Sequence, residues 1–194
     1  MTNQTRLVSA RGQSMIEMAI VLPLVVVTIL GLIDISYALL DQHVVTKLTR
    51  EGSNLISRDT SLQDAVNALK SMSSRPVDFS STSTVIFSVV KRVATTGATN
   101  YNRDILYQRC QYGALAASSK LTTVGNGSFG SAPDYQANNS DNDANLQITN
   151  LPANINTLGG MIYITEVYTS HQLLTPLNQF GITVPSTLYS IAYF

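Results

Sequence analysis

The sequence is poor in cysteine and in charge. Cys110 is the one cysteine among 194 residues, so a disulfide within the chain is excluded. Either packing alone holds the fold, or Cys110 pairs between chains. A lone cysteine in a strand-like stretch is typically a small buried apolar residue, and we expect this for Cys110. Only 12% of residues are charged, and 12 Lys and Arg balance 12 Asp and Glu. A nucleic-acid-binding protein needs a basic patch, so no nucleic-acid partner is expected.

Motifs for catalysis and for cofactor binding are also lacking. The sequence has no nucleophile elbow, no phosphate-binding loop and no zinc-binding pair of histidines. His43 and His171 have no metal-ligand residue at a suitable spacing, and we expect both at the surface. Residues 141–145, DNDAN, open like a calcium loop, but Leu146 stands where glycine is required and Pro152 where glutamate is required, so a polar turn is expected. We therefore predict no enzymatic activity, no metal and no cofactor.

A long apolar run near the N-terminus dominates the rest of the sequence. It carries no charge from Met18 to Ile33, and residues 18–40 can span a bilayer, which needs about 20 residues. Arg6 and Arg11 precede the run, and no Lys or Arg follows residue 120. Basic residues before a span favour a cytoplasmic N-terminus.

Three interpretations of this run compete. It could be a secretory signal, with Ser36-Tyr37-Ala38 as the cleavage site, or an anchor that is never cut. It could also follow a leader that is removed on the cytoplasmic side after Gly12, which would leave the apolar helix on the mature chain. Apolar residues recur at helical spacing as far as Leu55, and they predict one helix over about residues 16–57. Ala38 would lie inside that helix, which disfavours the secretory signal.

Short motifs at both ends of this run carry a family resemblance. The stretch GQSMIE, Gly12 to Glu17, resembles the processing site of type IV prepilins. The continuation EMAIVLP (17–23) and the later GLID (31–34) resemble the TadE-like proteins, pilin-like components of the tight-adherence pilus apparatus. Residues 163–192 are also similar to the last two strands of that family, while the middle of the chain shows no resemblance.

The resemblance implies that a prepilin peptidase cuts between Gly12 and Gln13. The new amine of Gln13 would then lie near Glu17, on the first turn of the mature helix. In a helix bundle away from water a carboxylate must be paired or neutralised. Family resemblance implies that Glu17 pairs with the amine of a neighbouring subunit and so recruits it in register. The plainer interpretation is that Glu17 lies in the lipid headgroup region and stabilises its own helix N-terminus.

The remainder of the chain predicts an exported α+β domain. We expect a short second helix at 61–72, begun by Ser61 and Asp64 in a capping-box arrangement. Runs rich in β-branched and aromatic residues predict four strands, at 84–93, 105–112, 161–170 and 186–194. Helices followed by strands indicate a mainly antiparallel sheet packed on the long helix, as in pilins. The predicted organisation is a leader at 1–12, a long helix at 13–57 that includes the transmembrane segment at about 18–40, and an exported domain at 58–194.

Two features of the exported domain need separate expectations. Residues 118–160 are mostly Ser, Thr, Asn, Gly, Asp and Ala, and we expect a long, mobile surface loop there. Glu166 alternates to the same face of its strand as Ile164 and Tyr168. It could point inward, but we expect it to face outward on an edge strand, where charge prevents aggregation.

Two functions follow from this organisation. The first is a minor pilin or pseudopilin of a tight-adherence or type IV-like pilus or secretion machine. It would be held in the bacterial inner membrane with its domain exported, cut by the peptidase, and packed against other pilin-like subunits, with an extracellular pilus as a further destination. The chain is too large for the main subunit of a tight-adherence fibre. The alternative is an uncleaved, signal-anchored exported binding module that uses the 118–160 loop.

Overall fold

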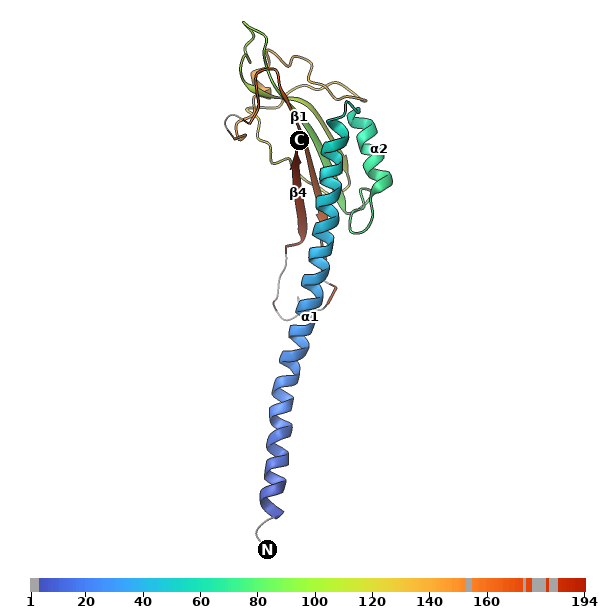
Figure 1. The fold of residues 1–194 in the computed structure, drawn as a ribbon, viewed down its shortest axis with the longest axis vertical. Coiled ribbons are helices and arrows are strands. Elements are labelled where there is room, and N and C mark those ends of the chain that lie inside the picture. Colours follow the sequence, from blue (N-terminus) through green and yellow to red (C-terminus); the bar gives the residue numbers. More distant parts are fainter. Residues whose placement is uncertain (1–3, 153–154, 173, 176–180, 182–184) are drawn as a thin grey trace. The chain divides into compact units, whose positions relative to one another are not determined.

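The computed structural model describes residues 4–152, 155–172, 174–175, 181 and 185–194. In chain order the elements are α1 (Gln4–Ile56), α2 (Leu62–Met72), β1 (Ser83–Arg92), β2 (Asp104–Gly113), the short 3-10 helix η1 (Ala144–Leu146), β3 (Met161–Ser170) and β4 (Thr187–Tyr193). The predicted fold class is confirmed: the chain has a long apolar N-terminal helix, a short second helix and a four-stranded antiparallel sheet (Figure 1).

Helix α1 extends further toward the N-terminus than the apolar pattern predicts. It begins at Gln4 rather than near residue 16, and Pro23 lies inside it. Backbone groups freed by a proline can be satisfied by neighbouring helices in a bilayer. The helix contributes to two compact units, which are residues 1–40 with 172–185, and residues 41–171 with 186–194.

Helix α2 forms as its sequence predicts. The hydroxyl of Ser61 accepts a hydrogen bond from the backbone N–H of Asp64 at 3.1 Å, and it donates to the Asp64 carboxylate at 2.7 Å. Both contacts stabilise the first turn. Leu62, Ala65, Val66 and Leu69 form the buried face of the helix.

The sheet has the strand order β2-β1-β3-β4, and every neighbouring pair is antiparallel. Strand β3 therefore lies between β1 and β4. The prediction that Glu166 faces outward on an edge strand is wrong, because β3 is an inner strand and Glu166 is 0% exposed. Strand order depends on contacts between distant segments, and alternation along one strand does not report it.

One face of the sheet packs on the helices and contains the main core. Residues of α1 from Val45 to Ile56 meet α2 and the inward side chains of the strands, and Phe87 at the centre is fully buried. Cys110 lies in this core, 6% exposed, as expected for a buried apolar residue. Figure 1 shows α2 beside the C-terminal part of α1.

The opposite face is covered by the segment between β2 and β3. The described residues between 118 and 160 form little regular structure, as expected, but Leu121, Ala137 and Leu146 are buried. Leu121 packs with Val90 and Ile164 of the sheet, and Ala137 and Leu146 form a second cluster with β2. The segment also pairs with the outer edge of β2 through isolated bridges, which include Gln136 to Gln108 and Gln147 to Ile105. It is therefore a packed cover rather than a loose excursion, and its mobility stays a prediction.

Candidate functional site

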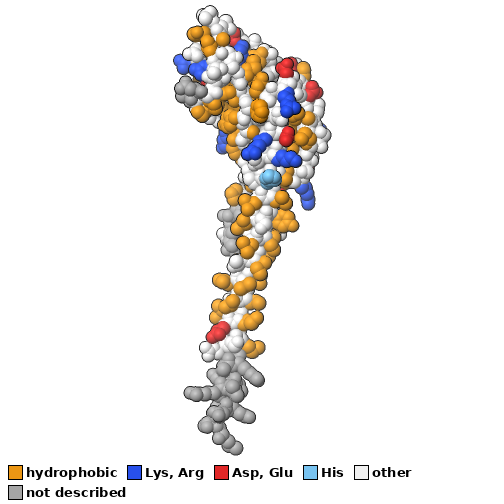
Figure 2. Space-filling model, in the orientation of Figure 1, with side chains coloured by type: hydrophobic (Ala, Val, Ile, Leu, Met, Phe, Trp, Pro, Cys, Tyr) orange, Lys and Arg blue, Asp and Glu red, His pale blue; other side chains and the backbone are white. Residues whose placement is uncertain are grey.

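The N-terminal part of α1 exposes its apolar side chains. From Met15 to Leu40 most large apolar residues are exposed, and Figure 2 shows them along the visible face of this stretch. The helix from Gln13 onward includes a stretch long and apolar enough to cross a membrane, and none of that stretch is buried. A helix that is apolar all round is stable only in lipid or among other apolar surfaces.

Glu17 lies at the start of this exposed stretch. The side-chain amide of Gln13 donates to the Glu17 carboxylate at 3.2 Å, one helical turn away, and both residues are exposed. Helix α1 begins at Gln4 and has no acidic residue in its first turn. Glu17 is thus more than three turns inside the uncut helix, and the favourable effect of the helix dipole fades within the first turn. Glu17 would gain that effect only if the helix began near Gln13.

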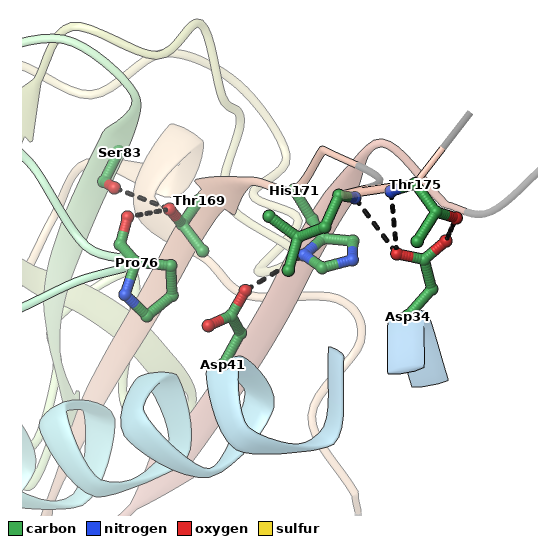
Figure 3. Close-up of polar contacts among 8 residues, drawn as sticks. Asp34, Asp41, Pro76, Ser83, Thr169, His171 and Thr175 are labelled. Atoms are coloured by element: carbon green, nitrogen blue, oxygen red, sulfur yellow. Dashed lines mark hydrogen bonds and ion pairs between the residues drawn. The ribbon is translucent and has the colours of Figure 1, made fainter. Parts of the chain in front are cut away.

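Asp34 is the buried carboxylate of this part of α1, at 5% exposure. Its Oδ1 atom accepts hydrogen bonds from the backbone N–H groups of Leu174, at 3.0 Å, and Thr175, at 3.2 Å. Its Oδ2 atom accepts from the Thr175 hydroxyl (Figure 3). Three donors on one short segment satisfy a carboxylate that stands in an apolar sequence.

A second carboxylate of α1 pairs with a histidine. Asp41 Oδ2 lies 3.1 Å from Nδ1 of His171, which follows β3 directly (Figure 3). The expected surface position of His171 is wrong, because this residue is 8% exposed and is packed beside its partner. His43 is exposed, as expected. The Asp41–His171 pair holds the end of β3 to α1.

Glu166 is the centre of a buried polar cluster on the sheet face away from the helices. Its carboxylate accepts from the Ser119 hydroxyl, from the Lys120 backbone N–H at 2.8 Å, and from the hydroxyls of Tyr168 and Tyr189 at 3.1 Å each. Four donors compensate for the loss of water around the charge. This cluster fixes the cover segment to β3 and β4.

Arg109 extends the same cluster from β2. Its guanidinium donates to Ser88 at 3.3 Å and to Ser119 at 3.2 Å. Burial lowers the pKa of Arg109, and the negative charge of Glu166 opposes that change. Burial raises the pKa of Tyr168 and of Tyr189, and the neighbouring Glu166 charge raises both further. The Glu166 carboxylate at its centre is fully buried and hydrogen-bonded, and the cluster stabilises the fold.

The acidic residues of the DNDAN stretch stabilise local structure. Asp141 accepts from the Thr95 hydroxyl at 2.7 Å and lies 3.7 Å from the Lys91 amine. The hydrogen bond from Thr95 is the main cause of the lowered pKa of Asp141. Asp143 accepts from the backbone N–H of Asn145 at 3.0 Å and caps η1. These contacts are those of the polar turn that the sequence predicts.

The structure leaves the predicted processing site untested and adds residues that the sequence did not indicate. Gly12 lies within α1, and the cut after it stays a prediction. Only one side of the contact between Asp34 and residues 174–175 is visible in the sequence, where Asp34 is an acid inside an apolar run. No sequence pattern points to Leu174 and Thr175, because their contact with Asp34 depends on the path of the chain after β3.

Comparisons with known proteins agree with the sequence motifs at the N-terminus. Residues 12–54 match the family model described as TadE-like protein. No curated protein and no solved structure matches the chain. The match ends before β1, so the similarity of residues 163–192 to the family's last strands stays a prediction. Over residues 12–54 the chain is therefore similar to the TadE-like protein family.

Proposed function

We propose that this chain is a pilin-like assembly subunit, a minor pilin or pseudopilin of a tight-adherence pilus or a related secretion machine. The observation that carries the proposal is that the two parts of α1 have different surroundings. From Met15 to Leu40 the helix exposes apolar side chains, and from Val45 to Ile56 it is part of the domain core. A subunit of this kind is held by lipid before assembly and by the helices of its neighbours afterwards.

Processing of the leader is the first part of this proposal. A prepilin peptidase that cuts between Gly12 and Gln13 leaves α1 with an N-terminal amine four residues before Glu17. The secretory alternative is disfavoured, because Ser36 to Ala38 lie inside α1 instead of in an extended segment. Enzymatic activity forms no part of the proposal, and neither does a cofactor.

Recruitment through Glu17 is the second part. The exposed Glu17 carboxylate has a side-chain amide as its described partner, and an amide does not neutralise its charge. In a bundle of apolar helices that charge needs a cation, and the Gln13 amine of a neighbouring subunit has the right sign and lies at the matching height. Pairing would then set the register between subunits.

The anchored binding module is less well supported. It needs residues 118–160 to present a binding surface, whereas this segment buries Leu121, Ala137 and Leu146 and pairs with the edge of β2. The segment is already used to cover the sheet. The anchored module and the pilin-like subunit still differ in one measurable property, the N-terminus of the mature chain.

The experiment is the intact mass of the chain purified from membranes of a cell that contains a prepilin peptidase. We expect a mass lower by that of residues 1–12, with Gln13 as the first residue. Gly12→Val should block the cut, because a β-branched side chain crowds the scissile position. Ser9→Val, the same change elsewhere in the leader, is the matched control and should be cut. A wild-type chain that begins at Met1 would indicate the anchored module, and one that begins at Leu39 would indicate a secretory signal.

A further inference from the structure

Asp34 presents an energetic problem that the helix alone does not solve. It lies between Ile33 and Ile35, which are 40% and 58% exposed, whereas Asp34 is 5% exposed. It precedes the end of the apolar run at Leu40 by six residues, or about 9 Å along a helix. A bare carboxylate at that level of a bilayer would be costly.

Residues 174–175, which contact Asp34, have backbone donors that also need partners. Backbone N–H groups at Leu174 and Thr175 lie outside any sheet, and in lipid each needs an acceptor. Asp34 Oδ1 accepts from both groups, and Oδ2 accepts from the Thr175 hydroxyl. The carboxylate thus satisfies the N–H groups, and the N–H groups satisfy the carboxylate, so neither is left without a hydrogen bond at the membrane surface. Hydrogen bonds to a charged acceptor are stronger than those between neutral groups.

The side chain displayed by this segment is apolar. Leu174 is 63% exposed, although its backbone N–H donates to Asp34. The neighbouring helix positions Leu32 and Ile35 are also exposed and apolar, and Tyr37 follows at 49% exposure. Tyrosine is enriched where a membrane meets water. Leu174 thus extends the apolar surface of α1 at its outer end.

We propose that residues 174–175 form a second membrane contact, in which Leu174 inserts into the outer interface of the bilayer while Asp34 holds its backbone. The occupant of this surface is lipid at the boundary of headgroups and acyl chains. Apolar side chains of peripheral segments reach about 5–10 Å into that boundary, which matches the level of Asp34. The inference rests on the proposed function, because it requires residues 18–40 to span the membrane.

The absence of tryptophan makes the test direct, since each substitution introduces the single indole of the chain. The full chain is reconstituted in vesicles of phosphatidylcholine and phosphatidylglycerol, with lipids brominated at shallow or deep acyl positions. The variants are Leu174→Trp, Leu24→Trp in the apolar helix, and Val124→Trp, an exposed position of the domain. Fluorescence quenching by the brominated lipids and by aqueous iodide is measured for each.

We expect the Leu174→Trp indole to be quenched most by the shallow bromines, and its iodide quenching constant to be several-fold below that of Val124→Trp. Leu24→Trp should be quenched most by the deep bromines. Adding Asp34→Ala to Leu174→Trp should restore access to iodide, because all three donors lose their acceptor. Adding Thr175→Ser retains the hydroxyl and should leave the quenching unchanged.

Three outcomes would overturn the inference in distinguishable ways. If iodide quenches Leu174→Trp as strongly as Val124→Trp while Leu24→Trp stays protected, the segment is in water and the membrane span stands. If Leu174→Trp is protected from iodide but no bromine quenches it, the surface is covered by protein. If iodide also quenches Leu24→Trp, the span itself is wrong and the proposed function fails with it.

Discussion

A Cβ atom on Gly52 of α1 would lie 2.8 Å from Cγ2 of Thr165 in β3 and 3.1 Å from Cε1 of Phe87 in β1. Helix and sheet therefore meet at this point with no space for a side chain. Both neighbours are fully buried, and Thr165 is β-branched, so neither can move away at low cost. The glycine is needed for the close approach of the two layers.

Gly52→Ala should lower the free energy of unfolding of the domain by about 1–3 kcal/mol, the usual cost of overpacking a core. Chemical denaturation followed by circular dichroism measures the change. Gly31→Ala is the matched control, since a Cβ there would meet no atom within 4 Å. Alanine favours a helix over glycine by about 1 kcal/mol, so a loss of stability in Gly52→Ala comes from packing. Gly52→Ala with a stability equal to or above that of wild type would contradict the close contact.

Glu166 gives a second prediction about stability. Glu166→Ala removes the shared acceptor of the tyrosine hydroxyls and the Lys120 N–H, and it removes the negative charge near Arg109. Removing one side of a buried charged network typically costs about 3–5 kcal/mol. Glu166→Gln keeps the shape and one acceptor oxygen, and its cost should be smaller. Denaturation midpoints of both variants check this, and Glu166→Ala at wild-type stability would contradict the cluster.

The contrast between α2 and Glu166 shows what the sequence could predict. The cap at Ser61 and the buried face of α2 depend on residues within one or two turns, and both were predictable. The environment of Glu166 depends on β4 pairing beside β3 and on Ser119 folding over the sheet. Those contacts join residues far apart in sequence, and no local pattern reports them.

The same distinction applies to the candidate site. Glu17 and its spacing from Gly12 were visible because the motif is local. Asp34 was visible only as an acid in an apolar run. Its partners Leu174 and Thr175 could not be predicted, because they follow it by about 140 residues. The burial of residues in the cover segment was not visible for a related reason. Its buried residues, such as Leu121 and Leu146, are isolated among polar neighbours and show no period.

The two tyrosines that donate to Glu166 predict a loss of stability at high pH. The pKa of Tyr168 and of Tyr189 is raised in the folded chain, whereas tyrosines of the unfolded chain have a pKa of about 10. The unfolded state therefore loses protons first, and stability that is complete below about pH 10 falls as the pH rises further. Tyrosinate absorbance should show a late phase that coincides with unfolding by circular dichroism. In denaturant that late phase should disappear. A single early phase in the folded chain would contradict the contacts of both hydroxyls with Glu166.

Limited proteolysis tests the cover segment. Residues 130–134 are consecutively exposed, whereas Leu121, Ala137 and Leu146 are anchored in the core. A non-specific protease at low concentration should therefore cut first near Asp134, and mass spectrometry identifies the fragments. Early cuts inside Met161–Ser170 with residues 118–152 intact would show that the segment is more rigid than the sheet it covers.

Glu17→Gln distinguishes recruitment from a local role of the carboxylate. If Glu17 acts only on its own helix, the substitution removes an exposed dipole interaction worth at most about 1 kcal/mol, and assembly should continue. If it pairs with the Gln13 amine of a neighbour in a dry bundle, the substitution leaves that amine unpaired at a cost of about 3–5 kcal/mol.

In the second case the Glu17→Gln variant should be cut after Gly12 and accumulate in the membrane as wild type does, because the single subunit does not contain the pair. It should nevertheless fail to co-purify with tagged pilin-like subunits of the same apparatus. Glu51→Gln makes the same chemical change elsewhere on α1 and should co-purify normally. Co-purification of Glu17→Gln at the wild-type level would remove the recruitment role and leave Glu17 as a local feature of the membrane surface.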